Sequence, residues 1–262
     1  MSERSRRGNK KGKLIFNIAF FIVEALFIIV LLVAVWQIGS YLLDSRKSGS
    51  FYDNLQSSVI LMDEGKGQED EKEKSQLPKA IDFDRLHEIS QDAVAWIYAP
   101  GGDINYVIAQ AEDNDYYLHR LLDGSQASGG TLFMDCGNSA DFSDWNTIVY
   151  GHHMKNGTMF ASLLDYQTPG YYEKNPVMYL YTPGHRYRLD LIAGCTIKAD
   201  DPIYAVPAAK EDRAEIVSRI SRMSTFISNA AVTDTDRLVT LSTCSYDYDE
   251  ARYVVIGRLR EG

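Results

Sequence analysis

Residues 240–244 read TLSTC and residues 245–249 read SYDYD, so a short apolar strand ends in a cysteine and opens at once into a polar loop. A strand end is a common position for a nucleophile, because the sheet fixes the residue while the loop leaves it accessible. Free cysteine is also among the most buried residue types, so a packing role is the competing interpretation of Cys244. The rest of the chain has to decide between the two.

Short apolar runs bounded by Gly and Pro turns recur on both sides of this stretch, after a short helix predicted over 82–90. We expect strands at 93–98, 106–110, 131–135, 147–150, 177–181, 187–197, 237–242 and 253–259. Many short strands with such turns predict a mainly β fold, in the form of a closed or nearly closed β-barrel.

One longer helix interrupts the β pattern over residues 210–227. Ile216, Ile220, Met223 and Ile227 recur at helical spacing and predict one apolar face. Acidic residues fill its first turn, where the helix dipole favours them. This segment is therefore predicted to be a surface helix that packs on the barrel just before the cysteine strand.

The N-terminal region predicts a membrane anchor. Residues 14–36 form a nearly unbroken apolar run, long enough at about 1.5 Å per residue to cross a hydrocarbon core of about 30 Å. Glu24 interrupts the run at a cost of about 2–3 kcal/mol, and it could equally mark a helix partner or be tolerated there. A cleaved signal peptide is the alternative, but the run is too long and no small-x-small cleavage site follows.

Charge and composition set the expected order of segments along the 262 residues. Residues 1–13 carry a net +5, which predicts a cytoplasmic tail by the positive-inside rule and puts the rest of the protein outside the cell. Residues 37–80 are expected to form an extracellular stalk or a helix packed on the domain, with helical spacing broken at Ser48-Gly49-Ser50 and a charged linker over 63–79. The main folded domain is expected over 81–262.

The formal charge of the whole chain is −9, so the residues after the basic tail carry −14. An acidic body argues against nucleic acid as a partner, because phosphate binding requires a basic face. The three cysteines, Cys136, Cys195 and Cys244, contain no C-x-x-C pair and no even-numbered framework, so neither a structural zinc site nor a disulfide scaffold is expected. Outside the cell an odd number leaves at least one thiol free or paired between molecules, and Cys244 is the candidate for the free one.

Two further residues supply chemistry that a thiol nucleophile needs. A histidine follows the strand 147–150, in the sequence Tyr150-Gly151-His152-His153, and can move protons. Arg252 opens the last strand, seven residues after Cys244, so the two strands can pair as a hairpin with thiol and guanidinium on one side. The non-catalytic alternatives are that the histidine caps a loop and that the arginine forms a surface ion pair. The His-His pair lacks further ligands at matching spacing, so no metal is expected.

Together these residues resemble class B of the sortase family. The resemblance rests on Tyr-Gly-His-His at 150–153, Thr-Leu-Ser-Thr-Cys at 240–244 and Arg-Tyr-Val-Val at 252–255, and extends through 82–138 and the helix before the cysteine strand. It covers about residue 81 to the C-terminus. The ordered set of His, Cys and Arg is more specific than any one of these motifs.

The resemblance implies an eight-stranded sortase barrel that cuts a sorting signal after Thr and passes the acyl group to an amine of the cell wall or of a pilin, without a cofactor. By position, Cys244 is the nucleophile, His152 the general acid/base, and Arg252 the residue that aligns substrate and stabilises the tetrahedral intermediate. The groove that binds the sorting signal would be lined by Ser242, Thr243, Tyr204 and Leu118.

The chain departs from the family pattern directly after the cysteine. Some class B members have an acidic residue in the next two positions, where this chain has Ser245 and Tyr246; Asp247 is a weak substitute, and the loop to Arg252 is short. Two other functions stay open at this point. One is a papain-like or cell-wall cysteine hydrolase, in which the cysteine usually precedes the histidine. The other is a membrane-tethered β-domain that binds an extracellular partner without catalysis.

Overall fold

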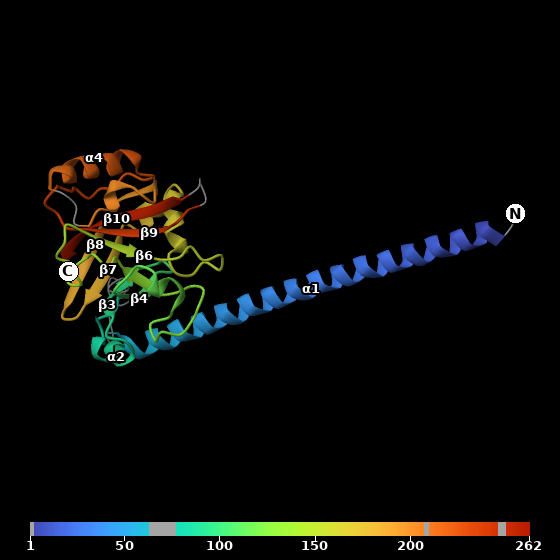
Figure 1. Cartoon of the computed structure of the whole chain (residues 1–262). Coiled ribbons are helices and arrows are strands. Elements are labelled where there is room, and N and C mark those ends of the chain that lie inside the picture. The colour runs from blue at the N-terminus through green and yellow to red at the C-terminus, as the bar shows by residue number, and fades with distance from the viewer. Residues whose placement is uncertain (1–2, 63–76, 207–209, 246–249) are drawn as a thin grey trace. The chain divides into compact units, whose positions relative to one another are not determined.

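The structure is a computed structural model that describes residues 3–62, 77–206, 210–245 and 250–262. The chain divides into two compact units, Met1–Lys47 and Ser48–Gly262. A single helix, α1 (Glu3–Val59), makes up the described part of the first unit and continues into the second (Figure 1). Of the helices in the described residues, α1 alone is long and apolar enough to cross a membrane, with a candidate segment at Val23–Val59.

The predicted helix break at Ser48-Gly49-Ser50 is wrong, because α1 runs through these residues without interruption. A glycine costs a helix only about 1 kcal/mol, which tertiary packing readily offsets. Here the last turns of α1 bury Tyr52, Leu55 and Val59 in the core of the second unit. The Tyr52 hydroxyl also donates to the Gly130 carbonyl at 2.6 Å. Most of the predicted charged linker, 63–76, lies outside the described residues.

Within the described residues, eight strands close a barrel in the order β10-β8-β7-β3-β4-β5-β6-β9, so the predicted mainly β barrel is confirmed (Figure 1). Its strands are β3 (Ala93–Tyr98), β4 (Asn105–Ala109), β5 (Leu132–Met134), β6 (Asn146–Tyr150), β7 (Val177–Thr182), β8 (His185–Lys198), β9 (Leu238–Cys244) and β10 (Ala251–Glu261). Each predicted strand lies within two residues of the observed bounds. The pairs β4–β5 and β6–β9 are parallel, and the other barrel pairs are antiparallel.

Shorter elements connect and cover these strands. They are β1 (Ile60–Leu61), β2 (Ala80–Ile81), α2 (Phe83–Ile89), α3 (Tyr171–Lys174), α4 (Arg213–Met223) and the 3₁₀ turns η3 (Tyr116–His119), η4 (Ala161–Gln167), η5 (Pro202–Tyr204) and η6 (Lys210–Asp212). The predicted helix over 82–90 is confirmed as α2, whose N-cap Asp82 accepts from the Arg85 amide at 3.0 Å.

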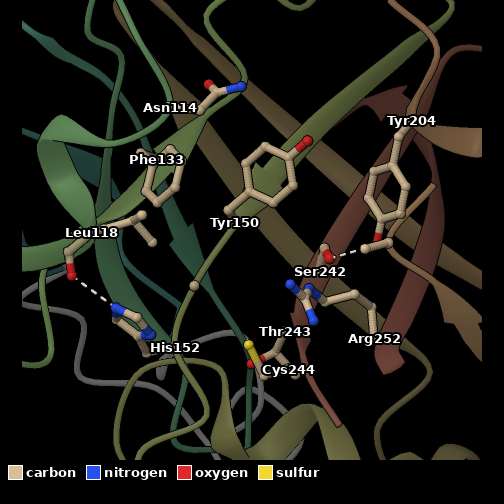
Figure 2. A pocket seen from close by; sticks show the side chains of 12 residues that line it. Asn114, Leu118, Phe133, Tyr150, His152, Tyr204, Ser242, Thr243, Cys244 and Arg252 are labelled. Atoms are coloured by element: carbon tan, nitrogen blue, oxygen red, sulfur yellow. Dashed lines mark hydrogen bonds between the residues drawn. The ribbon is translucent and has the colours of Figure 1, made fainter. Parts of the chain in front are cut away.

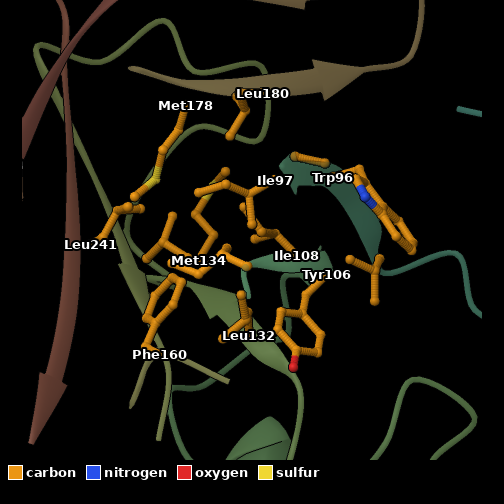
Figure 3. Packing of buried hydrophobic residues seen from close by; sticks show 14 of the residues in the cluster. Trp96, Ile97, Tyr106, Ile108, Leu132, Met134, Phe160, Met178, Leu180 and Leu241 are labelled. Carbon is orange, nitrogen blue, oxygen red and sulfur yellow. The ribbon is translucent and has the colours of Figure 1, made fainter. Parts of the chain in front are cut away.

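The barrel interior holds the main hydrophobic core (Figure 3). Alternate residues of each strand point inward, as the pleat of a β-strand requires. On β9 these are Val239 and Leu241, and on β10 Tyr253 and Val255, all of them buried. The intervening residues of both strands therefore face outward, and this face carries the site described below.

A second apolar cluster lies on the outer face, where α4 covers β8 and β10. Ile216 and Ile220 of α4 pack there, but the helix is shorter than predicted: Met223 is 43% exposed and Ile227 is 88% exposed. The cause is Ser224, which adopts extended backbone and whose hydroxyl accepts from the Gly194 amide and donates to the Phe226 carbonyl. Serine side chains that bond nearby backbone compete with helix formation, so α4 ends here.

Candidate active site

The pairing of β9 with β10 fixes the positions of two of the predicted site residues. Cys244, the last residue of β9, is the direct antiparallel partner of Arg252. Because Leu241 and Val255 face the core, Cys244 and Arg252 both lie on the outer face. Directly opposite residues have Cβ atoms about 5 Å apart. The predicted hairpin is therefore present, with Cys244 and Arg252 as cross-strand neighbours on one face.

His152 reaches the same place from the end of β6. β6 runs parallel to β9 with Tyr150 beside Ser242, and the next amide, of Gly151, donates to the Ser242 carbonyl at 3.0 Å. A Cβ at Gly151 would collide with the side chains of Leu132 and Phe160. Glycine is therefore required at this position, because there is no space for a side chain.

The orientation of the His152 ring is set by a backbone carbonyl. Its Nε2–H donates to the Leu118 carbonyl oxygen at 2.7 Å, which leaves Nδ1 as the nitrogen that gains and loses a proton. In Figure 2 this second nitrogen is on the edge of the ring turned toward Cys244. Burial lowers the pKa of His152; the Leu118 carbonyl partly offsets this, and His119 lowers it further.

These side chains open into one pocket of about 290 Å³ (Figure 2). It is lined by Asn114, Leu118, Phe133, Tyr150, Gly151, His152, Ala199, Tyr204, Ser242, Thr243, Cys244 and Arg252. All seven residues singled out from the sequence are among them. Thr243 differs from the others in that strand alternation turns its side chain to the inner face of the barrel.

The wall on the far side of Ser242 comes from η5. Tyr204 and Ser242 share a hydrogen bond of 2.7 Å between their hydroxyls, and the Tyr204 ring stacks on Tyr150 at 6.1 Å. Burial raises the pKa of Tyr204, so it stays protonated and serves as a neutral hydrogen-bonding group. Neighbouring Ile203 accepts from the buried Asn146 amide at 2.9 Å, which ties this turn to β6.

Sequence reasoning did not single out Asn114, Phe133, Tyr150 or Ala199 as lining residues. Two of them are joined by a carboxylate behind the pocket wall: Asn114 Nδ2 and the Tyr150 hydroxyl both donate to Asp135 Oδ2 at 2.9 Å. Tyr150 stands next to the Gly-His motif, which was a usable signal. The Asn114–Asp135 pairing joins residues that are 21 positions apart, so no local pattern reveals it.

The second histidine of the pair, His153, does not line the pocket and instead bridges to Met159. No group of three or more His, Cys, Asp or Glu side chains suited to a metal occurs among the residues that the structure describes. Tyr246 and Asp247, at the departure from the family pattern, lie outside the described residues.

All three cysteines are free thiols. Cys136 is exposed, Cys195 is buried in the cluster under α4, and Cys244 is half-buried in the pocket wall. Burial raises the pKa of the Cys195 thiol to about 12, so it stays neutral at pH 7. Of the three, Cys244 alone lies beside both an arginine and a histidine in the pocket.

Comparison with known proteins gives one consistent result. A sortase domain model matches residues 97–260. Sortase B of Listeria monocytogenes is 33% identical over 179 residues, which cover 66% of this chain and 72% of that protein. The structure of a Staphylococcus aureus sortase B–substrate complex matches with a TM-score of 0.65 at 30% identity, over 69% of this chain and 85% of that one. Sortase B from B. anthracis in complex with AAEK1 matches with a TM-score of 0.68 at 30% identity, over 84% and 100%.

Proposed function

The chain belongs to the sortase family and, within it, to class B, and we propose that Cys244, His152 and Arg252 are the catalytic residues of this cysteine transpeptidase. As a class B sortase, the protein processes sorting signals. The observation that carries the proposed residues is the register of β9 and β10, which pairs Cys244 with Arg252 at the edge of the pocket that His152 also lines.

In the first half-reaction the Cys244 thiolate attacks the carbonyl carbon of the scissile peptide bond, and a C–S bond forms. The oxygen becomes an oxyanion, to which the Arg252 guanidinium donates paired hydrogen bonds. As the C–N bond breaks, His152 gives its Nδ1 proton to the leaving amine. The product is a thioester on Cys244.

In the second half-reaction an amine attacks the thioester carbonyl, and His152 Nδ1 accepts the proton that the amine loses. The C–N bond forms, the C–S bond breaks, and Cys244 leaves as thiolate. Nδ1 can serve both steps because the Leu118 carbonyl keeps the proton of the other nitrogen in place.

We propose that the sorting signal lies along the pocket and is cut after Thr. On one side of the peptide, Ser242 and Tyr204 present hydroxyls that are hydrogen-bonded to each other at 2.7 Å. Leu118 lines the other side of the pocket, and Thr243 lines its floor. The acceptor in this proposal is an amine of peptidoglycan or of a pilin.

The N-terminal apolar helix fits membrane anchoring. We propose that residues 14–36 span the membrane, with the basic residues 1–13 in the cytoplasm. The catalytic domain, 81–262, then lies outside the cell together with the segment 37–80, which packs into its core through Tyr52, Leu55 and Val59. This orientation follows from the charge of the tail, which carries a net +5.

Mass spectrometry of the full chain in detergent micelles tests the function. We expect the protein to cleave peptides from a sorting-signal library after Thr, and to form the amide product when triglycine or a lysine peptide is added. Cys244→Ala should do neither. Undiminished cleavage by Cys244→Ala would overturn the assignment, and hydrolysis without any amide product would point to a hydrolase.

A further inference from the structure

The turn η3 presents two groups to His152. Leu118 provides the carbonyl that accepts from Nε2 at 2.7 Å, and the next residue, His119, stacks its ring on the His152 ring. The ring centroids are 5.6 Å apart and the planes differ by 17°. The mechanism proposed above uses the Leu118 carbonyl but gives the second imidazole no role.

The turn holds His119 in a fixed position. The His119 carbonyl accepts from the Ala127 amide at 3.0 Å, and the Tyr117 carbonyl accepts from the Thr131 amide at 3.0 Å. Tyr117 itself is 2% exposed, and its hydroxyl donates to Asp92 at 2.6 Å. A ring carried by such a well-tethered turn can restrain the ring that it touches.

Few charged groups surround His152, so a second imidazole beside it can change its charge state. Its hydrogen-bond partner is a neutral carbonyl, and no Asp or Glu is among the described residues that line the pocket. The titratable groups that line the pocket with His152 are Tyr150, Tyr204, Cys244 and Arg252. Outside this lining, His119 of η3 stacks on the His152 ring, and His153 follows His152 in the chain. A protonated His119 adds a like charge, which disfavours the imidazolium form of His152.

We propose that His119 is a positioning residue for His152: its ring holds one face of the His152 imidazole so that Nδ1 stays turned toward Cys244, and its positive charge, when it is protonated, opposes a second charge there. This inference rests on the proposed function of His152 and goes beyond it, since His119 is not among the described residues that line the pocket.

Two variants separate the two effects. His119→Phe keeps an aromatic ring for stacking and removes the charge, whereas His119→Lys keeps a positive charge and removes the ring. His185→Phe is the matched control, because His185 also stacks on an aromatic ring, that of Tyr187 at 6.0 Å, but starts β8 and does not line the catalytic pocket.

The experiment is an NMR titration of the ring nitrogens of His152 in the full chain in detergent micelles, with pH profiles of peptide cleavage alongside. In His119→Phe we expect the pKa of His152 to rise, because a repelling charge is gone, and the alkaline side of the rate profile to move to higher pH, because cleavage uses His152 as a proton donor. The Nε2 proton, protected by the Leu118 carbonyl, should still exchange slowly.

In His119→Lys we expect that proton to exchange faster and the cleavage rate to fall by roughly tenfold, less than the 10²–10⁴-fold that loss of the acid/base itself costs. His185→Phe should match the parent in every readout. The proposal is overturned if His152 titrates in His119→Phe as in the parent, or if His119→Lys leaves the exchange of the Nε2 proton unchanged. A parent that cleaves no peptide would instead refute the proposed function, while the titration would still decide the coupling.

Discussion

Two of the cysteines flank the same strand and have opposite surroundings. Cys195 on β8 pairs with Val254 of β10, and Cys244 on β9 pairs with Arg252, two residues earlier on the same strand. Both side chains are on the outer face of the barrel. Above Cys195 the helix α4 closes an apolar cover, whereas above Cys244 the face is open as a pocket.

This difference shows that the role of a thiol on this face depends on whether α4 covers it, and not on the strand that carries it. Under α4 the Cys195 thiol only packs, and packing needs no charged neighbour. Its pKa rises to about 12 because burial disfavours the thiolate. At the open position the neighbours are a guanidinium and an imidazole, which are the groups that acyl transfer needs. The predictions below alter one side of this contrast at a time.

The largest effect is expected from removing each thiol in turn. Cys244→Ala should lower the rate of peptide cleavage by about 10³-fold or more, because the proposed nucleophile is lost. Cys195→Ala should keep the parent rate within about threefold, since that thiol only packs. Steady-state cleavage of a fluorogenic sorting peptide measures both. Equal losses in the two variants would contradict the contrast.

Next comes the charge beside the open thiol. Arg252→Lys keeps the charge but loses the planar pair of donors, so kcat/KM should fall by about 10²-fold. The matched control is Arg258→Lys, on the same strand and face but about 20 Å away along β10, where the partner is Asp190 at 3.4 Å. The control should cleave like the parent. A wild-type rate in Arg252→Lys would remove the arginine from the mechanism.

A smaller effect is expected from opening the cover over Cys195. Ile220 of α4 is 1% exposed in that cluster, and Ile220→Ala should lower the free energy of unfolding by about 2–4 kcal/mol. Labelling of Cys195 by a maleimide, followed by peptide mapping, should accelerate at the same time. Met223→Ala, at a position 43% exposed, is the control and should change stability by less than about 0.5 kcal/mol. If Cys195 in Ile220→Ala stays as unreactive as in the parent, α4 is not its cover.

The smallest change is Tyr204→Phe at the open site. It removes the 2.7 Å hydrogen bond to Ser242 and should cost about 1 kcal/mol in binding, seen as a rise of a few-fold in KM with kcat unchanged. Cleavage rates over a range of peptide concentrations separate the two constants. An unchanged KM together with a lower kcat would give Tyr204 a role in the chemical steps instead.

Much of the fold could be predicted from the sequence, because strand periodicity and Gly or Pro turns are local signals. The same locality explains the errors: the helix through Ser48-Gly49-Ser50 is stabilised by distant packing of Tyr52 and Leu55, and α4 ends early because Ser224 bonds across to Gly194. Neither contact leaves a trace in the nearby sequence.

The candidate site follows a similar division. Cys244, His152 and Arg252 stand at strand ends and were found from their positions and from the family resemblance. The groups that set how they work come from elsewhere in the chain. The Leu118 carbonyl that orients His152 is 34 residues away, and Asp135 links Asn114 to Tyr150 from behind the pocket wall. Only the closed barrel brings these groups together.

The most direct test of the contrast is to find which thiol carries the acyl group. The full chain is mixed with a sorting peptide in the absence of an amine, quenched in acid, digested and mapped by mass spectrometry. We predict a thioester adduct on Cys244, with Cys195 and the exposed Cys136 unmodified. An adduct on either of those two cysteines, or cleavage with no adduct on Cys244, would contradict it.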